Sequence, residues 1–355
     1  MTKRCTLALV LLLALYCQAE QRPAAVTPQQ VDEIVDHLLS GLEDYVFPEI
    51  AEKLQRQIQT HRSGYRAISD SNALAARLTE DLRAVGNDNH LAVSFGEELM
   101  LQNEPSPAEK EHAHAFDLAN GHGIRSARRL PGNIGYVDLA YFAPDSDAGT
   151  ALAAAMQLVS GTDALIVDLR RNGGGSGGTV TALLSYFFEE STQLSSIVER
   201  KHGQPEERQN WTTPYVTGPR YLGKPVFVLT SHRTHSAAEQ CAYDLKNTHR
   251  ATVVGERTGG GANSSTGEIA LGYGFSAFIP NGQARSPLTH SNWQGTGVEP
   301  DVATTVSDAL IIAYKLALKD SKPSVESEGL TKERQIALQD PQGALAEEIA
   351  GFQKN

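Results

Sequence analysis

One segment, residues 224–246, constrains the fold more than any other stretch of the chain: KPVFVLTSHRTHSAAEQCAYDLK. Its run 225–229 is short, apolar and uncharged, which is typical of a buried strand. A polar turn follows, and then four apolar residues fall at i, i+3, i+4 and i+7 on one helix face: Ala238, Cys241, Ala242 and Leu245. The segment therefore predicts a buried strand that leads into a helix, with Ser236 at the junction.

Ser236 has two interpretations on this stretch alone. A hydroxyl at the carboxyl end of a strand lies near helix N–H groups without intrahelical partners, and such groups can stabilise an oxyanion. The position therefore suits a serine nucleophile. Alternatively, Ser236 caps the helix, and Glu239 three residues later completes a capping box.

The second half of the chain alternates between strand and helix patterns from residue 132 onward. Strands are expected at 134–142, 164–169 and 251–255, a hairpin at 269–279, and helices at 148–159, 179–188 and 308–318. This alternation predicts an α/β core over residues 132–320. Residues 321–355 have the composition of a charged helical tail, and the sequence indicates no function for it.

The first half predicts a small helical unit within a domain that covers residues 20–95. Apolar stripes indicate three helices, the first of which begins at Thr27 with a proline at its first position. A strand pattern that starts at His90 follows the third helix. These residues thus predict a small N-terminal helical domain.

Residues 96–131 are polar and are expected to form a variable connection between the two parts. They contain His112 and His114, a pair that resembles part of a metal site. The cysteine or acidic partners of such a site are missing, so we interpret the pair as part of a solvated loop and predict no metal.

Composition and the first residues limit the class of protein. The net charge of −11 argues against nucleic acid as a partner, because phosphate binding needs basic patches. Residues 1–19 resemble a secretory signal, with two basic residues, an apolar run and a small-x-small cleavage site that begins at Cys17. Lipidation at Cys17 is disfavoured by the bulky Tyr16 before it. No later stretch is apolar enough for membrane insertion, so we expect a secreted or periplasmic protein.

Two further features suit catalysis by a serine. The glycine run 173–175 follows a strand and precedes a helix, and it lacks the Gly-Lys-Ser/Thr ending of a phosphate loop. It can aim N–H groups at a ligand as an oxyanion hole, or it can be a plain tight turn. His90 can act as a general base or be a half-exposed surface residue. His232 and His235 are weaker candidates for the base.

Four motifs in order resemble one family: DALIVDLRRNGGGS, VLTSHRTHSAAEQCAYDLK, RATVVGERTGGGAN and SNWQGTGVEPDV. They are similar to the tail-specific, or C-terminal processing, serine peptidases. Within that family the chain is similar to interphotoreceptor retinoid-binding protein modules and the tricorn protease core. The resemblance implies an α/β core of the ClpP/crotonase type, built of ββα units, and implies that the small N-terminal helical domain is a cap on this core.

The resemblance also implies roles for single residues. Ser236 matches the nucleophile, and His90 aligns with the base of tricorn-like members. The N–H of Ala237, with one from Gly173 or Gly174, matches the oxyanion hole.

The chain departs from the family pattern at three points. No lysine follows the Gly-Glu-x-Thr stretch, so a Ser–Lys dyad is not expected. Gln294 stands where tricorn-like members carry a glutamate that orients the histidine, and a glutamine brings no charge to an imidazolium. The segment between His90 and residue 132 is also too short for a PDZ domain, which needs roughly 90 residues as a compact module.

The sequence thus predicts an extracytoplasmic serine peptidase that acts on peptides or proteins through Ser236, His90 and Gln294, without a cofactor. The alternative is a non-catalytic module of the same fold that binds an apolar ligand such as a retinoid or fatty acid. The oligomeric state is left open.

Overall fold

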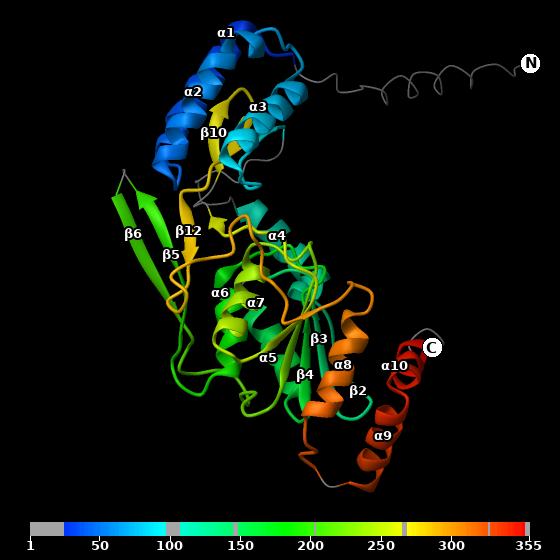
Figure 1. Ribbon diagram of the computed structural model, residues 1–355. Coiled ribbons are helices and arrows are strands. Elements are labelled where there is room, and N and C mark those ends of the chain that lie inside the picture. Colours follow the sequence, from blue (N-terminus) through cyan, green and yellow to red (C-terminus); the bar gives the residue numbers. More distant parts are fainter. Residues whose placement is uncertain are drawn as a thin grey trace, which may run out of the picture.

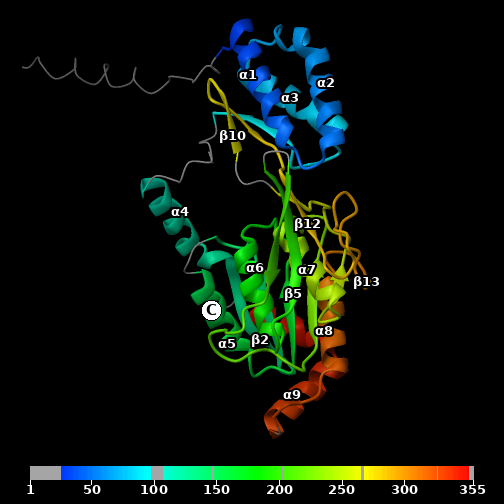
Figure 2. The same cartoon turned by 90° about the vertical axis from the view of Figure 1, so that its left-hand side faces the viewer.

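The computed structural model describes residues 25–96, 107–144, 148–201, 204–264, 268–325 and 327–351. The predicted signal segment, residues 1–19, lies outside them. The described chain has an α/β body and a helical unit at one end of it, joined by extended strands (Figures 1 and 2). Both parts agree with the predicted fold class, a mixed α/β protein with a helical N-terminal region.

The α/β body is built on a six-stranded sheet in the order β13-β8-β7-β4-β3-β2. Its strands are β2 (Ile124–Leu130), β3 (Ile134–Leu139), β4 (Ala164–Asp168), β7 (Val226–Thr230), β8 (Thr252–Gly255) and β13 (Val302–Ala303). Strands β3, β4, β7, β8 and β13 run parallel, and β2 pairs antiparallel with β3 at the edge. Strand β7 is the buried strand expected before Ser236, and it lies in the middle of the sheet.

Helices cover both faces of this sheet, which explains why its central strands are apolar throughout. One face packs on α5 (Ala148–Val159), α6 (Gly177–Leu184) and α7 (Ala237–Asn247). The other face packs on α8 (Ala309–Asp320), α9 (Glu328–Gln339) and α10 (Pro341–Gly351). Alternate residues of β7 divide between the two sides, since Val226 and Val228 face the first layer while Phe227 and Leu229 face the second.

The helical unit consists of α1 (Pro28–Gly41), α2 (Pro48–Tyr65) and α3 (Ser71–Gly86), with a short 3-10 turn, Leu42–Asp44, after α1. Its core is completed by a three-stranded sheet of β1 (Ala92–Phe95), β11 (Phe275–Phe278) and β10 (Glu268–Gly272). The predicted hairpin near residue 272 therefore does not join the α/β body; it packs among the N-terminal helices (Figure 1). A distant part of the sequence thereby ties the helical unit to the rest of the chain.

The predicted connection, residues 96–131, is more regular than expected. Its described part contains α4 (Pro107–Ala119), a short turn at Gly121–Gly123 and the edge strand β2. The loop interpretation of His112 was wrong, because this residue lies exposed on α4. An exposed helix of alanine and charged residues has no strong apolar stripe, which is the signal that reveals a helix in sequence. The described residues between β1 and β2 hold this single α-helix and no PDZ domain.

A third sheet, in the order β6-β5-β12-β9, lies beside α6 and α7 (Figure 1). Its strands are β5 (Gln193–Lys201), β6 (Gln204–Trp211), β9 (Asn263–Ser264) and β12 (Gly282–Arg285). The sequence did not indicate the hairpin β5–β6, because β6 is exposed along nearly its whole length and shows no apolar alternation.

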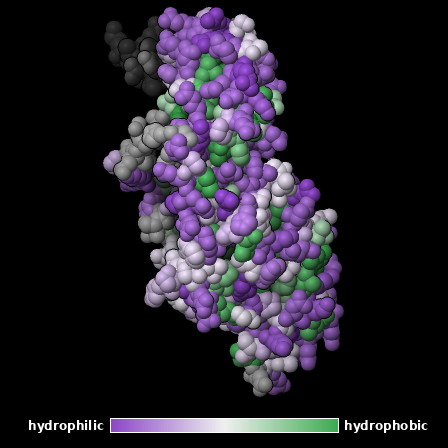
Figure 3. Space-filling model, turned by 60° about the vertical axis from the view of Figure 1, so that its left-hand side comes forward, coloured by the Kyte–Doolittle hydropathy of each residue, from purple (hydrophilic) through white to green (hydrophobic). Residues whose placement is uncertain are grey.

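Hydrophobic residues on the face shown in Figure 3 form separate patches among hydrophilic ones. Across the residues that the structure describes, no helix has the length and apolar character needed to span a bilayer.

Candidate active site

Ser236 occupies a strained turn between β7 and α7. Its backbone has φ 54° and ψ −122°, a conformation that costs a non-glycine residue about 1–3 kcal/mol and occurs mostly at functional sites. The capping box that the Ser-x-x-Glu spacing predicts is present: the Ser236 side chain faces the backbone nitrogen of Glu239, and the Glu239 side chain accepts from the Ser236 backbone N–H at 2.9 Å. A cap uses the serine oxygen only as an acceptor, so this role does not engage the hydroxyl proton.

Glu239 holds this turn in place. Its side chain is fully buried, and its carboxylate accepts hydrogen bonds from three backbone N–H groups: Ser236 at 2.9 Å, Gly260 at 2.7 Å and Gly261 at 2.7 Å. The hydroxyl of Thr258 is a fourth donor. Burial raises the pKa of Glu239, while these four donors favour the charged form. Glu239 thus fastens the Ser236 turn to the loop of residues 258–261.

The glycine turn lies against Ser236. Gly174 has φ 116°, and a β-carbon at that position would lie 2.9 Å from Ser236 Cβ and 3.2 Å from the Ala237 nitrogen. The N–H of Gly174 donates to Asn172 Oδ1 at 2.9 Å, so it points away from an oxyanion. No acceptor is found among the described residues for the N–H groups of Ala237, Gly173 or Gly175. These three groups are available to a ligand.

His90 lies in the segment between α3 and β1, and its side chain is 14% exposed. Its ring stacks on Phe278 of β11, with centroids 6.1 Å apart, and lies 4.9 Å from the ring of His235. Gly261 lies against both imidazoles: a β-carbon there would lie 2.3 Å from His235 Nε2 and 2.7 Å from His90 Cε1. The loop that Glu239 fastens to the Ser236 turn therefore also contacts both histidines.

His235 differs from His90 in its partners. It is half-buried, and burial followed by the proximity of His90 lowers its pKa. A lowered pKa favours the neutral ring at physiological pH. His232, the third histidine of this region, is exposed and faces Glu256.

Asp88 is the residue that the sequence did not single out. It is 1% exposed, and its Oδ1 lies 3.0 Å from the His90 backbone nitrogen and 3.3 Å from His90 Nδ1. Its Oδ2 accepts from Tyr45 Oη at 3.1 Å and from Asn263 Nδ2 at 2.7 Å. Burial alone would raise the pKa of Asp88, but the hydrogen bonds from His90 and Asn263 hold it below its usual value.

A local signal for Asp88 did exist in the sequence. An aspartate two residues before a histidine can accept from that histidine's backbone N–H, as in an Asx turn. The chain supports this turn with Asn87, which ends α3 in the left-handed conformation at φ 47°. The contact to Asn263 had no such signal.

Gln294 accepts two backbone N–H groups through its side-chain oxygen. Its Oε1 accepts from the backbone nitrogens of Ala262 at 2.7 Å and Asn263 at 3.1 Å. The structure thus brings Ser236, Ala237 and the glycine turn together, and it sets His90 beside the loop of residues 258–261. Nδ1 of His90 contacts Asp88. The predicted pairing of Gln294 with His90 stays a prediction.

A cleft of about 490 Å³ opens beside Ser236. Ser236, Ala237 and Gly175 line one side, and residues of the third sheet and the loop after it line the other, among them Ile197, Arg208, Ala284 and Trp293. The cleft is therefore partly apolar, with charged residues at the β5–β6 hairpin, and it contains the Ser236 turn.

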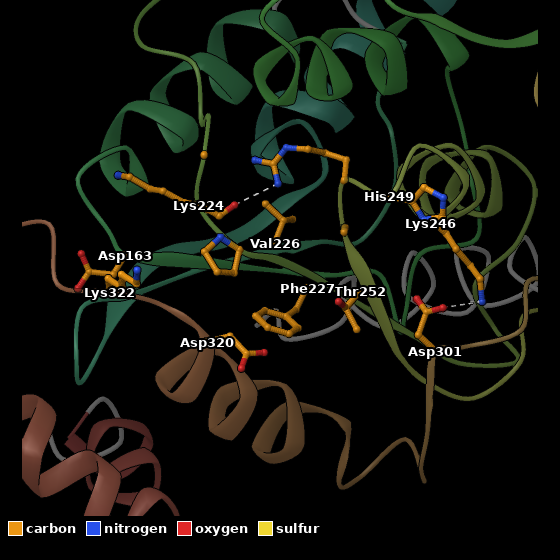
Figure 4. A pocket seen from close by; sticks show the side chains of 14 residues that line it. Asp163, Lys224, Val226, Phe227, Lys246, His249, Thr252, Asp301, Asp320 and Lys322 are labelled. Atoms are coloured by element: carbon orange, nitrogen blue, oxygen red, sulfur yellow. Dashed lines mark hydrogen bonds and ion pairs between the residues drawn. The ribbon is translucent and has the colours of Figure 1, made fainter.

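A larger cavity, of about 760 Å³, lies at the opposite ends of the strands (Figure 4). Its charges are largely matched within the protein, since Lys246 pairs with Asp301 at 2.9 Å and Lys224 donates to two backbone carbonyls. It holds no serine or cysteine, so the smaller cleft is the candidate active site. Over the described ranges, no group of three or more His, Cys, Asp or Glu side chains is arranged to hold a metal.

Comparison with known proteins identifies the family to which this chain is similar. A sequence profile described as peptidase family S41 matches residues 133–304, and one described as the N-terminal domain of peptidase S41 in eukaryotic IRBP matches residues 25–120. A crystal structure of a predicted peptidase from Parabacteroides merdae ATCC 43184 superimposes with a TM-score of 0.58 at 19% identity, covering 85% of this chain and 100% of that one. This likeness supports a shared fold.

Two curated relatives match about half of this chain. The carboxyl-terminal-processing protease of Synechocystis sp. is 30% identical over 170 residues, 48% of this chain and 37% of that protein. The chloroplastic carboxyl-terminal-processing peptidase 1 of Arabidopsis thaliana is 30% identical over 173 residues, 48% of this chain and 33% of that protein. The chain therefore spans about a third of the length of these relatives. The two profiles, the curated relatives and the architecture agree: this chain belongs to peptidase family S41, a family of serine-type peptidases.

Proposed function

We propose that the protein hydrolyses peptide bonds, with Ser236 as the nucleophile and His90 as the general base. The observation that carries this proposal is the Ser236 turn: a serine with strained backbone angles lines a cleft, next to an Ala237 N–H that has no acceptor among the described residues. A residue that merely capped α7 would need neither the positive φ nor the cleft.

The proposed chemistry gives each group one role. Ser236 Oγ attacks the carbonyl carbon of the substrate, and His90 Nε2 takes the hydroxyl proton. The Ala237 N–H, with a second N–H from the turn of residues 173–175, donates to the oxyanion that forms. His90 then protonates the leaving amine, and water hydrolyses the acyl-enzyme with His90 again as base.

The substrate we propose is an extended peptide or a protein segment that enters the cleft. The curated relatives are named as a protease and a peptidase of carboxyl-terminal processing, and peptides or proteins are the substrate class that we propose for this chain. The signal-like residues 1–19 support an extracytoplasmic location, secreted or periplasmic.

The test is intact-mass labelling of the protein with a fluorophosphonate. We expect one adduct on the wild-type chain and none on Ser236→Ala, which also loses peptide hydrolysis with little change in stability. Ser176→Ala is the matched control, because Ser176 caps α6 beside the same glycine turn, and it should keep the adduct. An adduct that persists in Ser236→Ala contradicts the assignment. A folded protein with no adduct that quenches a fluorescent fatty acid would favour the apolar-ligand module instead.

A further inference from the structure

A histidine base needs an acceptor on the nitrogen that does not face the nucleophile. That acceptor fixes the tautomer and orients the ring, and a charged acceptor stabilises the imidazolium as it forms. The family pattern assigns this task to the position of Gln294, which is neutral here and already accepts two backbone N–H groups. Some other group must therefore act on His90 if the protein is a peptidase.

We propose that Asp88 is the positioning residue for His90, an inference that rests on the proposed function. Asp88 contacts His90 twice, through the backbone N–H at 3.0 Å and through Nδ1 at 3.3 Å. A carboxylate can only accept, so Nδ1 carries the proton and Nε2 is the free base. Asp88 acts through His90 and does not touch the substrate.

The surroundings of Asp88 are those of a carboxylate kept charged in a buried place. The hydrogen bonds from Tyr45 and Asn263 to Oδ2 leave Oδ1 for His90. A buried ionised carboxylate persists only when such donors replace water. The charge thus lies next to the imidazole and is shielded from solvent.

Gln294 then has a supporting task that suits a neutral amide. By holding the backbone of Ala262 and Asn263, it fixes the strand from which the Asn263 side chain reaches Asp88. In this chain the carboxylate that orients the base therefore lies on the segment of the base itself, and Gln294 is three contacts away from the imidazole, through Asn263 and Asp88. A second carboxylate at 294 would add nothing to His90.

The test compares three variants of the full chain in peptide hydrolysis: Asp88→Asn, Asp81→Asn and Gln294→Glu. Asp88→Asn should lower kcat on the order of 10³-fold with KM changed less than about threefold, because the ring loses its tautomer and its counter-charge. The acid limb of the kcat/KM profile should also move to lower pH. Asp81→Asn is the matched control, because Asp81 is also a buried aspartate bonded to a histidine and a tyrosine, but those partners, His61 and Tyr65, lie on α2. It should keep kcat within about fivefold, and Gln294→Glu should not raise kcat.

The proposal is overturned if Asp88→Asn keeps kcat within about fivefold, or if kcat falls in Asp88→Asn and Asp81→Asn in proportion to their loss of stability. Nitrogen-15 NMR of the histidines in the wild-type protein gives an answer even if Asp88→Asn does not fold. The neutral His90 ring should carry its proton on Nδ1, and a proton on Nε2 would contradict the proposal. Absence of fluorophosphonate labelling would remove the peptidase function and leave this tautomer measurement valid, so the two failures are distinguishable.

Discussion

Glu239 accepts the backbone N–H of Ser236, and the same carboxylate accepts the N–H groups of Gly260 and Gly261. One buried side chain therefore sets the turn that carries the nucleophile and the loop that contacts both histidines. The Ser-x-x-Glu spacing that usually only starts a helix here also connects two parts of the site.

We expect Glu239→Gln to loosen this connection. An amide puts an NH₂ group where an oxygen accepted N–H donors, so at least one buried backbone N–H loses its partner at a cost of about 1–3 kcal/mol. The free energy of unfolding from urea titration should fall by that amount, and fluorophosphonate labelling of Ser236 should slow. Glu80→Gln, at an exposed position on α3, should change neither. Equal stability and labelling in the Glu239 variant would contradict the role given to it.

Gly174→Ala should be among the most damaging small substitutions in the chain. The backbone there has φ 116°, and the new β-carbon would lie 2.9 Å from Ser236 Cβ, so the turn must shift. We expect loss of labelling at Ser236 and a lower melting temperature.

Gly149→Ala is the matched control for this substitution. Gly149 lies in α5, with nothing within 4 Å of the added carbon. Alanine there should raise stability by about 0.5–1 kcal/mol. A Gly174→Ala protein that is labelled at the wild-type rate would show that the glycine turn does not need its close approach to Ser236.

Asp244 makes stability depend on pH. It lies on the buried face of α7, where burial raises its pKa to about 6 despite hydrogen bonds from Ser195. The folded state therefore binds a proton that the unfolded state has already released between about pH 4 and 6. In that window stability should fall as pH rises, by about 3 kcal/mol in total.

Asp244→Asn should remove this contribution. The difference in unfolding free energy between wild type and variant, from urea titrations at pH 4 to 7, should change through the window and level off above pH 6. Asp44→Asn, at an exposed site, provides the comparison. A constant difference between wild type and Asp244→Asn would show that Asp244 does not titrate in this range.

The sequence by itself determined the elements whose signals are local. The run 225–229 became β7 because it is apolar on both faces, and the stripe after Ser236 became α7 because its spacing fits one helix face. The three N-terminal helices followed in the same way from their apolar stripes. The resemblance of the motifs to the family also predicted Ser236 as the nucleophile and His90 as the base.

Tertiary structure decided what depends on distant partners or on exposed surface. Strand β6 and helix α4 have little apolar periodicity because solvent surrounds them, so no sequence pattern revealed them. Asp88 and Asn263 lie 175 positions apart, and their contact exists only because β10 and β11 pack on the helical unit and bring the strand before them to His90. A hydrogen bond of that separation leaves no periodic trace, so only the folded chain could connect Asp88, His90 and the loop around Gly261.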